Sequence, residues 1–166
     1  TRSCGEKVDT LFNARTENKR VSFPRVSPDG NYLLYGKGDY GGFFVWHKEA
    51  DLYMMDLNTG EHYALDGANS DDVESYHSWS SNSRWIIYIS RRLDGLYSRL
   101  YISYIDENGK AGKAFLMPQK DIRFYDDFMK SYNVPEFVSG KVKNQGFSVS
   151  SHVKDGSGIN VTFRNQ

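Results

Sequence analysis

Histidine and acidic side chains gather at two places in the sequence where they could bind a metal ion. His47, Glu49 and Asp51 alternate just before an expected strand, so an extended backbone would turn all three to one side. One nitrogen and two oxygen ligands suit a divalent transition metal. The alternative interpretation is a polar loop in which Asp51 fixes the turn into the strand, and the residues leave both interpretations open.

The second cluster is the most acidic stretch of the chain. Asp71, Asp72, Glu74 and His77 could bind a hard cation such as calcium, which prefers oxygen ligands. The stretch lacks the Asp-x-Asp-x-Asp-Gly ladder of a dedicated calcium loop. A solvated loop, with His77 at the edge of a core beside Trp79, explains it equally simply.

A metal-dependent lyase or hydrolase is the enzyme hypothesis that these clusters allow. It would require a divalent metal cofactor, held by His47, Glu49, Asp72 and His77. The only approach to a Gly-x-Ser-x-Gly nucleophile motif is residues 146–150, which lack the second glycine, and the sequence holds no phosphate-binding glycine loop. We therefore assign no catalytic residue, and a non-catalytic module without a cofactor is the favoured hypothesis.

Aromatic and arginine side chains in expected loops form the candidate binding surface. Exposed aromatic residues mark protein-binding and sugar-binding surfaces, although they can also fold back over a sheet edge. Two adjacent arginines after an expected strand could bind a carboxylate or phosphate, or could form ion pairs with Asp51 or Glu74. The predicted surface consists of Tyr40, Phe43, Phe44, Trp46, Arg91, Arg92 and Tyr97.

Composition limits the class of protein. The 166 residues include 21 Lys and Arg against 21 Asp and Glu, so no basic excess supports nucleic-acid binding. The single cysteine, Cys4, excludes an internal disulfide framework, and no stretch is long enough for a transmembrane helix. Aromatic residues make up 15% of the chain, which favours strands over helices.

A repeated unit is the clearest structural signal. Residues 23–36 match residues 76–90, with Ser27 on Ser80 and Tyr35 on Tyr88. Further on, residues 50–61 match residues 98–110 in the same order. Turn chemistry at Ser-Pro-Asp-Gly 27–30 and Asn-Thr-Gly 58–60 separates the expected strands. Three or four antiparallel strands in each of two such units predict an all-β fold of β-propeller blades.

The unit boundaries follow from these matches. We expect a strand of a preceding blade within residues 1–22 (Val8–Phe12), blades at 23–69 and 70–120, and a connector at 121–139. A short helix is expected near 122–131, from the spacing of Phe124, Phe128 and their neighbours. Residues 140–166 are expected to form a tail or degenerate edge strands, since Phe147, Val149 and Val153 alternate with polar residues.

The motifs resemble a known repeat family. Ser27–Gly30 before an aromatic-aliphatic strand, then Asp51-Leu52-Tyr53 and Asp56–Gly60, look like the WD40-like (PD40) repeat of TolB-type β-propellers. Residues 46–53, 76–85 and 132–137 are similar to a subgroup of these proteins in Bacteroidetes. The resemblance covers about residues 8–138. It implies an exported protein of the periplasm or cell envelope.

The favoured function is therefore a binding or scaffold module of the bacterial envelope that interacts with a protein or a glycan through propeller loops. A propeller ring needs about four or more blades, whereas the repeats here make about two and a half. We expect either a segment of a longer protein or blades too degenerate to recognise in the tail. Unpaired blade edges would also favour oligomers.

Overall fold

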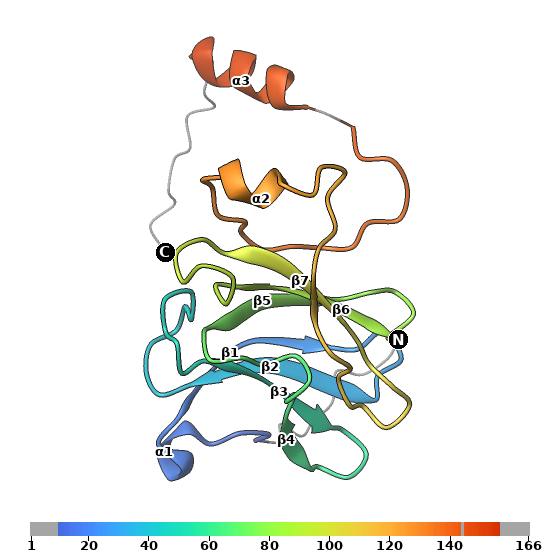
Figure 1. Ribbon diagram of the computed structural model, residues 1–166. Helices are drawn as coiled ribbons and strands as arrows, with labels where there is room; N and C mark the ends of the chain where they lie inside the picture. Colours follow the sequence, from blue (N-terminus) through green and yellow to red (C-terminus); the bar gives the residue numbers. More distant parts are fainter. Residues whose placement is uncertain (1–9, 144, 157–166) are drawn as a thin grey trace, which may run out of the picture.

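The computed structural model describes residues 10–143 and 145–156 (Figure 1). Within these residues, eight strands form two separate four-stranded antiparallel sheets, and inside each sheet the strands pair in chain order. The first sheet, or first blade, contains β1 (Arg20–Val26), β2 (Tyr32–Gly38), β3 (Asp51–Asp56) and β4 (His62–Ala64). The second blade contains β5 (Glu74–Trp79), β6 (Trp85–Ser90), β7 (Arg99–Tyr104) and β8 (Phe115–Leu116).

This arrangement confirms the predicted fold class, an all-β structure of propeller-type blades. The start of the first blade differs from the expectation, because residues 20–22 already belong to β1 and pair with residues 36–38 of β2. The strand expected at Val8–Phe12 lies partly outside the described residues, and Thr10–Phe12 are not in a strand. None of the helices in the described ranges has the length and apolar character needed to span a bilayer.

The turn between β1 and β2 is closed by side-chain hydrogen bonds. Ser27 Oγ donates to Asp29 Oδ1 at 2.6 Å and accepts the backbone N–H of Tyr32 at 3.0 Å. Gly30 has a φ of 78°, a left-handed conformation that glycine adopts without steric cost. The Ser-Pro-Asp-Gly pattern therefore makes the turn that its residue types favour.

The equivalent turn of the second blade lacks the Asp-Gly pair but keeps the geometry. Ser80 Oγ donates to Asn82 Oδ1 at 2.6 Å and accepts the N–H of Trp85 at 3.0 Å. Asn82 thus replaces the aspartate, and Ser83 adopts a φ of 59° in place of the glycine. The departure in sequence is absorbed because an asparagine oxygen accepts the same hydrogen bonds as a carboxylate oxygen.

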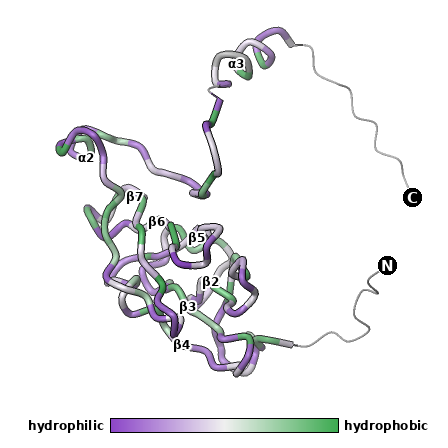
Figure 2. Tube along the Cα trace, turned by 90° about the vertical axis from the view of Figure 1, so that its right-hand side faces the viewer, coloured by the Kyte–Doolittle hydropathy of each residue, from purple (hydrophilic) through white to green (hydrophobic). Residues whose placement is uncertain are grey.

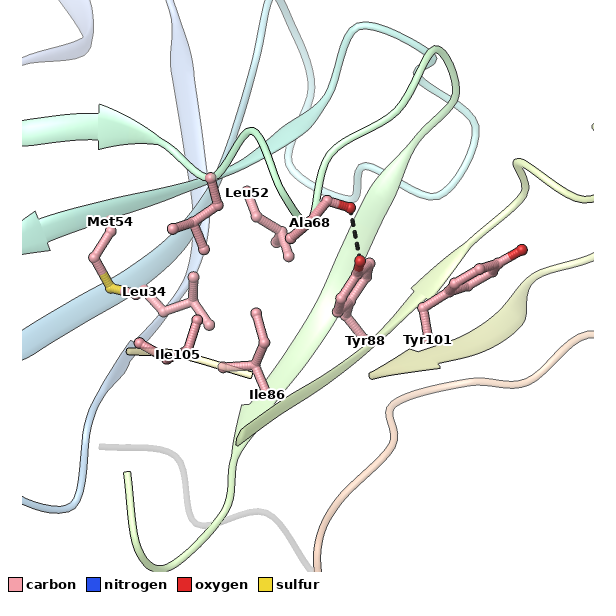
Figure 3. Close-up of a cluster of buried hydrophobic side chains, with 9 residues drawn as sticks. Leu34, Leu52, Met54, Ala68, Ile86, Tyr88, Tyr101 and Ile105 are labelled. Carbon is pink, nitrogen blue, oxygen red and sulfur yellow. Dashed lines mark hydrogen bonds between the residues drawn. The ribbon is translucent and has the colours of Figure 1, made fainter. Parts of the chain in front are cut away.

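The main hydrophobic core lies between the two blades (Figure 3). Leu34, Leu52 and Met54 of the first blade meet Ile86 and Tyr88 of the second, and all five side chains are fully buried. Strand β5 lies against β1, β2 and β3, so it joins the second blade to the first. Burial of these side chains is the main force that holds the blades together.

The two blades use opposite faces in this contact. Tyr35 and Tyr53 stack across β2 and β3 of the first blade with ring centroids 6.0 Å apart, and Tyr88 and Tyr101 stack in the same way in the second at 6.3 Å. The second pair belongs to the core between the blades, whereas the first pair lies on the face of the first blade that points away from it. Each blade thus has one face for each neighbour, as in a propeller.

In the part of the chain that the structure describes, three helices lie outside the sheets: α1 (Ala14–Glu17), α2 (Phe124–Asp127) and α3 (Gly146–Lys154). The expected helix near 122–131 is confirmed only as the single turn α2. Residues 140–166 were expected to form a tail or edge strands, whereas the structure has the helix α3 at Gly146–Lys154, in which Val149 and Val153 share one side. Both valines are exposed, and α3 lies apart from the sheets (Figure 2).

The connector after the second blade returns across that blade. The N–H of Tyr132 donates to the carbonyl of Ser98 at 2.9 Å, and the N–H of Ser98 donates to Ser131 Oγ at 3.1 Å. Ser78 Oγ donates to the carbonyl of Pro135 at 2.5 Å. Residues 128–137 therefore cover part of the second blade that would otherwise contact solvent.

Candidate functional site

The long loops of both blades lie at the same end of the sheets. Residues 39–50 join β2 to β3, residues 65–73 lead into β5, and residues 91–98 join β6 to β7 (Figure 1). The turns at 27–31, 57–61 and 80–84 and the longer connection at 105–114 lie at the opposite end, as antiparallel pairing requires. We call the first end the long-loop rim. It carries all seven residues of the predicted binding surface.

Phe44 is the exception to the expected exposure, since its side chain is fully buried. It forms a small core with Ala50 and Val73 beneath the rim. The ring lies on β2, where a Cβ at Gly36 or Gly38 would approach it to 3.3 or 3.2 Å. The two glycines thus make room for the ring. Phe44 is an anchor of loop 39–50, which corrects its assignment to the binding surface.

Three other aromatic side chains of this loop are exposed to solvent. Tyr40, Phe43 and Trp46 are 70%, 72% and 68% exposed. Tyr40 packs edge-on against His47 with ring centroids 4.8 Å apart, and Phe43 contacts Phe23 of β1 at 5.9 Å. A loop that is anchored from below and has large apolar rings on its outer side has the composition of an interaction surface.

The aromatic surface continues onto the first strand of each blade, which the sequence did not indicate. Phe23 in β1 and Tyr76 in β5 occupy equivalent bulges and have φ values of 55° and 48°. Their rings contact each other at 4.9 Å. Bulky residues rarely adopt positive φ, and bulges commonly redirect side chains at functional sites. The only sequence signal is the Ser-aromatic pair at 22–23, repeated at 75–76.

Arg92 is occupied by a structural ion pair. Its Nη2 lies 2.8 Å from Oε1 of Glu74, a fully buried carboxylate that also accepts hydrogen bonds from Ser70 Oγ and Ser90 Oγ. Burial raises the pKa of Glu74, whereas the hydrogen bond from Ser70 and the Arg92 charge act in the opposite direction. The guanidinium also lies over Tyr101 at 4.6 Å. The ion pair with Glu74, one alternative from the sequence, is the one that forms.

Asp51 lies near the same buried pair. Partial burial, with repulsion from Glu74 and Asp66, raises its pKa to about 6, and Arg92 opposes the shift. Asp51 is the first residue of β3, and it pairs with Lys37 of β2. The two blades therefore meet, at the long-loop rim, around the guanidinium of Arg92 and the carboxyl groups of Glu74 and Asp51. Glu74 is the fully buried carboxyl group of the two.

Arg91 has a different environment from Arg92. Its side chain is nearly buried, with 7% exposure, and its guanidinium carbon lies 4.2 Å from the centroid of the Trp46 ring. Nη2 donates to the carbonyl of Gly95, whereas Nε has no hydrogen-bond partner. Among the described residues no carboxylate lies within ion-pair distance of Arg91.

Tyr97 supports the loop of the second blade more than it forms a surface. It is half-buried, and its ring lies 4.9 Å from the guanidinium carbon of Arg99. Arg99 in turn pairs with Asp94 at 3.3 Å. The same loop exposes Leu93 and Leu96, which were not among the residues predicted from the sequence. The sequence signal that could have indicated them is the pair of leucines on either side of Asp94-Gly95, a dipeptide typical of turns.

Two of the four residues of the metal hypothesis contact each other, and the other two have partners elsewhere. His47 Nδ1 lies 3.2 Å from Glu49 Oε1 on the rim. Asp72 accepts the N–H of Val73 at 2.8 Å. His77 is buried in the middle of β5, with Nε2 3.2 Å from the carbonyl oxygen of Leu34. Within 10–143 and 145–156, no group of three or more His, Cys, Asp or Glu residues fits a metal ion. The metal hypothesis stays a prediction.

Comparisons with known proteins find 24 matching chains among solved structures. No family model and no curated protein matches the sequence. Among solved structures, the chain is similar to the β-propeller domain of the Trilobed protease from Pyrococcus furiosus, described as having an open velcro topology. The TM-score is 0.39 with 18% sequence identity, and the match covers 60% of this chain and 30% of that one.

Proposed function

We propose that this protein is a non-catalytic binding and scaffold module whose long-loop rim binds a protein or glycan partner. The observation that carries the proposal is the loop 39–50, in which Phe44 is buried while Phe43 and Trp46 are exposed. An aromatic side chain loses favourable burial when it faces water, by about 1.5–3 kcal/mol for a ring of this size. A fixed loop that presents such rings supports a role in binding.

The rim is held rigidly from both blades, which favours binding without a large ordering cost. Phe44 fixes the first-blade loop, and the Glu74–Arg92 pair fixes the base of the second-blade loop. Large aromatic side chains in rigid positions are the residues that most often dominate binding energy. The geometry thus supports recognition through Tyr40, Phe43 and Trp46.

We place the module in the periplasm or cell envelope of a bacterium. This part of the proposal rests on the resemblance of the two repeats to TolB-type PD40 blades. The expectations that the chain belongs to a longer protein or forms oligomers stay predictions, and light-scattering mass of the purified chain measures the second.

The test compares two surface variants of the purified protein. The double variant Phe43→Ser/Trp46→Ser removes two exposed rings from the rim, and Ile122→Ser removes an apolar side chain that is 96% exposed outside it. Each protein is labelled and applied in solution to a glycan array. Each protein is also immobilised and probed with a bacterial envelope protein extract. We expect wild type and Ile122→Ser to retain the same bound molecules and the double variant to lose them. Equal binding by all three proteins, or no binding by wild type, would refute the proposal.

A further inference from the structure

Arg91 differs in its charge balance from Arg92 and Arg99, the other arginines at this end of the second blade. Arg99 pairs with Asp94, and Arg92 pairs with the buried carboxylate of Glu74. Arg91 is 7% exposed yet has no such partner in the described part of the chain, and its buried Nε makes no hydrogen bond. Burying a guanidinium without a counter-charge is unfavourable by several kcal/mol in general. The position therefore requires an explanation beyond stability.

The contacts that Arg91 does make orient it without neutralising it. The Trp46 ring lies against the guanidinium at 4.2 Å, and the carbonyl of Gly95 accepts one N–H. An aromatic face and a carbonyl hold the fork in one plane but supply no negative charge. Because Nε is enclosed, the donors left for a carboxylate are the other N–H groups of the two terminal nitrogens, which are held in one plane.

The acidic groups nearby are committed to their own loops. Asp94 pairs with Arg99 and also accepts the N–H groups of Leu96 and Tyr97. Asp72 also lies near this loop, since its Oδ2 would lie 3.8 Å from a Cβ placed on Gly95. Its Oδ1 accepts the N–H of Val73, and neither oxygen comes within ion-pair distance of Arg91.

We propose that Arg91 and Trp46 form a subsite for a carboxylate of a protein partner, within a polypeptide segment whose acidic residue is flanked by apolar residues. The inference rests on the proposed function of the rim and names the partner's chemistry. The unneutralised guanidinium supplies the charge complementarity. The exposed side chains of Tyr40, Phe43, Leu93 and Leu96 supply apolar surface in the same two loops.

The leucines decide between a polypeptide and an acidic glycan. Sugars bind to flat aromatic faces and to hydrogen-bonding groups, neither of which Leu93 or Leu96 offers. Aliphatic side chains of a polypeptide gain by burial against such leucines. The occupant that fits both the arginine and its surroundings is therefore a protein segment.

The experiment selects ligands from a random library, so it does not require the natural partner to be identified. A library of random peptides displayed on phage is panned on the purified wild-type protein, and the enriched peptides are synthesised. Their affinities are measured by fluorescence anisotropy for wild type, Arg91→Gln, Arg91→Lys, Phe43→Ser and the control Arg15→Gln, which changes an exposed arginine of α1. Thermal unfolding of each variant is recorded, and Arg91→Lys keeps the positive charge if Arg91→Gln folds poorly.

The expected result is enrichment of peptides with Asp or Glu beside apolar residues. Their affinity falls about tenfold or more for Arg91→Gln and less for Arg91→Lys, and it weakens with rising salt for wild type. Arg15→Gln binds like wild type. The inference is overturned if the peptides lack acidic residues, or if Arg91→Gln binds them as well as wild type does. It is also overturned if polygalacturonate binds more tightly than the peptides through Arg91.

These outcomes separate the subsite from the general function of the rim. If peptide binding is lost in Phe43→Ser but unchanged in Arg91→Gln, the rim binds protein and the carboxylate subsite is wrong. If the enriched peptides bind Phe43→Ser and Arg91→Gln as tightly as wild type, both proposals fail.

Discussion

Phe43 and Phe44 are adjacent in sequence and opposite in environment, which gives a sharp prediction. Phe44 is fully buried against Ala50 and Val73, whereas Phe43 is 72% exposed. Burial of a phenylalanine contributes about 1.5–3 kcal/mol by transfer, and the cavity left by truncation raises the loss to about 3–5 kcal/mol. Because Gly36 and Gly38 have no side chains that could fill this cavity, we expect Phe44→Ala to lose about 4 kcal/mol.

The assay is urea unfolding of the two single variants, followed by circular dichroism and tryptophan fluorescence. Phe43→Ala should stay within about 0.5 kcal/mol of wild type in stability, as surface substitutions do, and should lose affinity for the ligand of the rim. Phe44→Leu should recover part of the lost stability because leucine fills part of the cavity. A loss below about 1 kcal/mol for Phe44→Ala, or an equal loss for Phe43→Ala, would refute the anchor assignment.

Three further predictions concern buried groups. Burial lowers the pKa of His77 from 6.5 to about 4, so the stability contributed by neutral His77 should be fully present above pH 6.5 and be lost as pH drops toward 4. The raised pKa of Asp51 acts in the opposite direction below about pH 6, so urea midpoints of His77→Gln should fall less with decreasing pH than those of wild type. Glu74→Gln should cost about 3–5 kcal/mol, and combining it with Arg92→Met should cost less than the two single losses together, in a double-mutant cycle. Gly67→Ala should lower the melting temperature by several degrees, because its Cβ would overlap the carbonyl of Ala111, and a normal melt would contradict this packing.

The sequence predicted the blades because their turns depend on local chemistry. Ser27 begins the turn between β1 and β2, and Ser80 begins the equivalent turn between β5 and β6. Each serine donates a hydrogen bond to a side chain two residues further on, so the turn motif can be recognised in the sequence. The strand β1 was harder to delimit, since Arg20 and Val21 are exposed and carry no clear alternation. Their strand conformation depends on pairing with β2, which is a tertiary effect.

The candidate site was predicted in its residue types but not in its division of roles. Phe43 and Phe44 are adjacent residues of the same type, so the sequence alone does not distinguish them. Phe44 is buried because its ring packs on Gly36 and Gly38, whereas Phe43 is exposed. Arg91 and Arg92 are likewise indistinguishable in the sequence. Arg92 forms an ion pair with Glu74, whereas Arg91 packs against the ring of Trp46, and both contacts join residues far apart in the chain.

The strictly sequential pairing of the strands has a consequence for folding kinetics. Each strand of a blade pairs with the next across one turn or loop, and no such pair is further apart in sequence than Tyr32 and Asp56. The core between the blades joins more distant residues, such as Leu34 and Tyr88. Closing a shorter loop costs less entropy, so pairing within a blade is favoured to form first. We expect the blades to form as early units, with docking of β5 onto the first blade as the slow step.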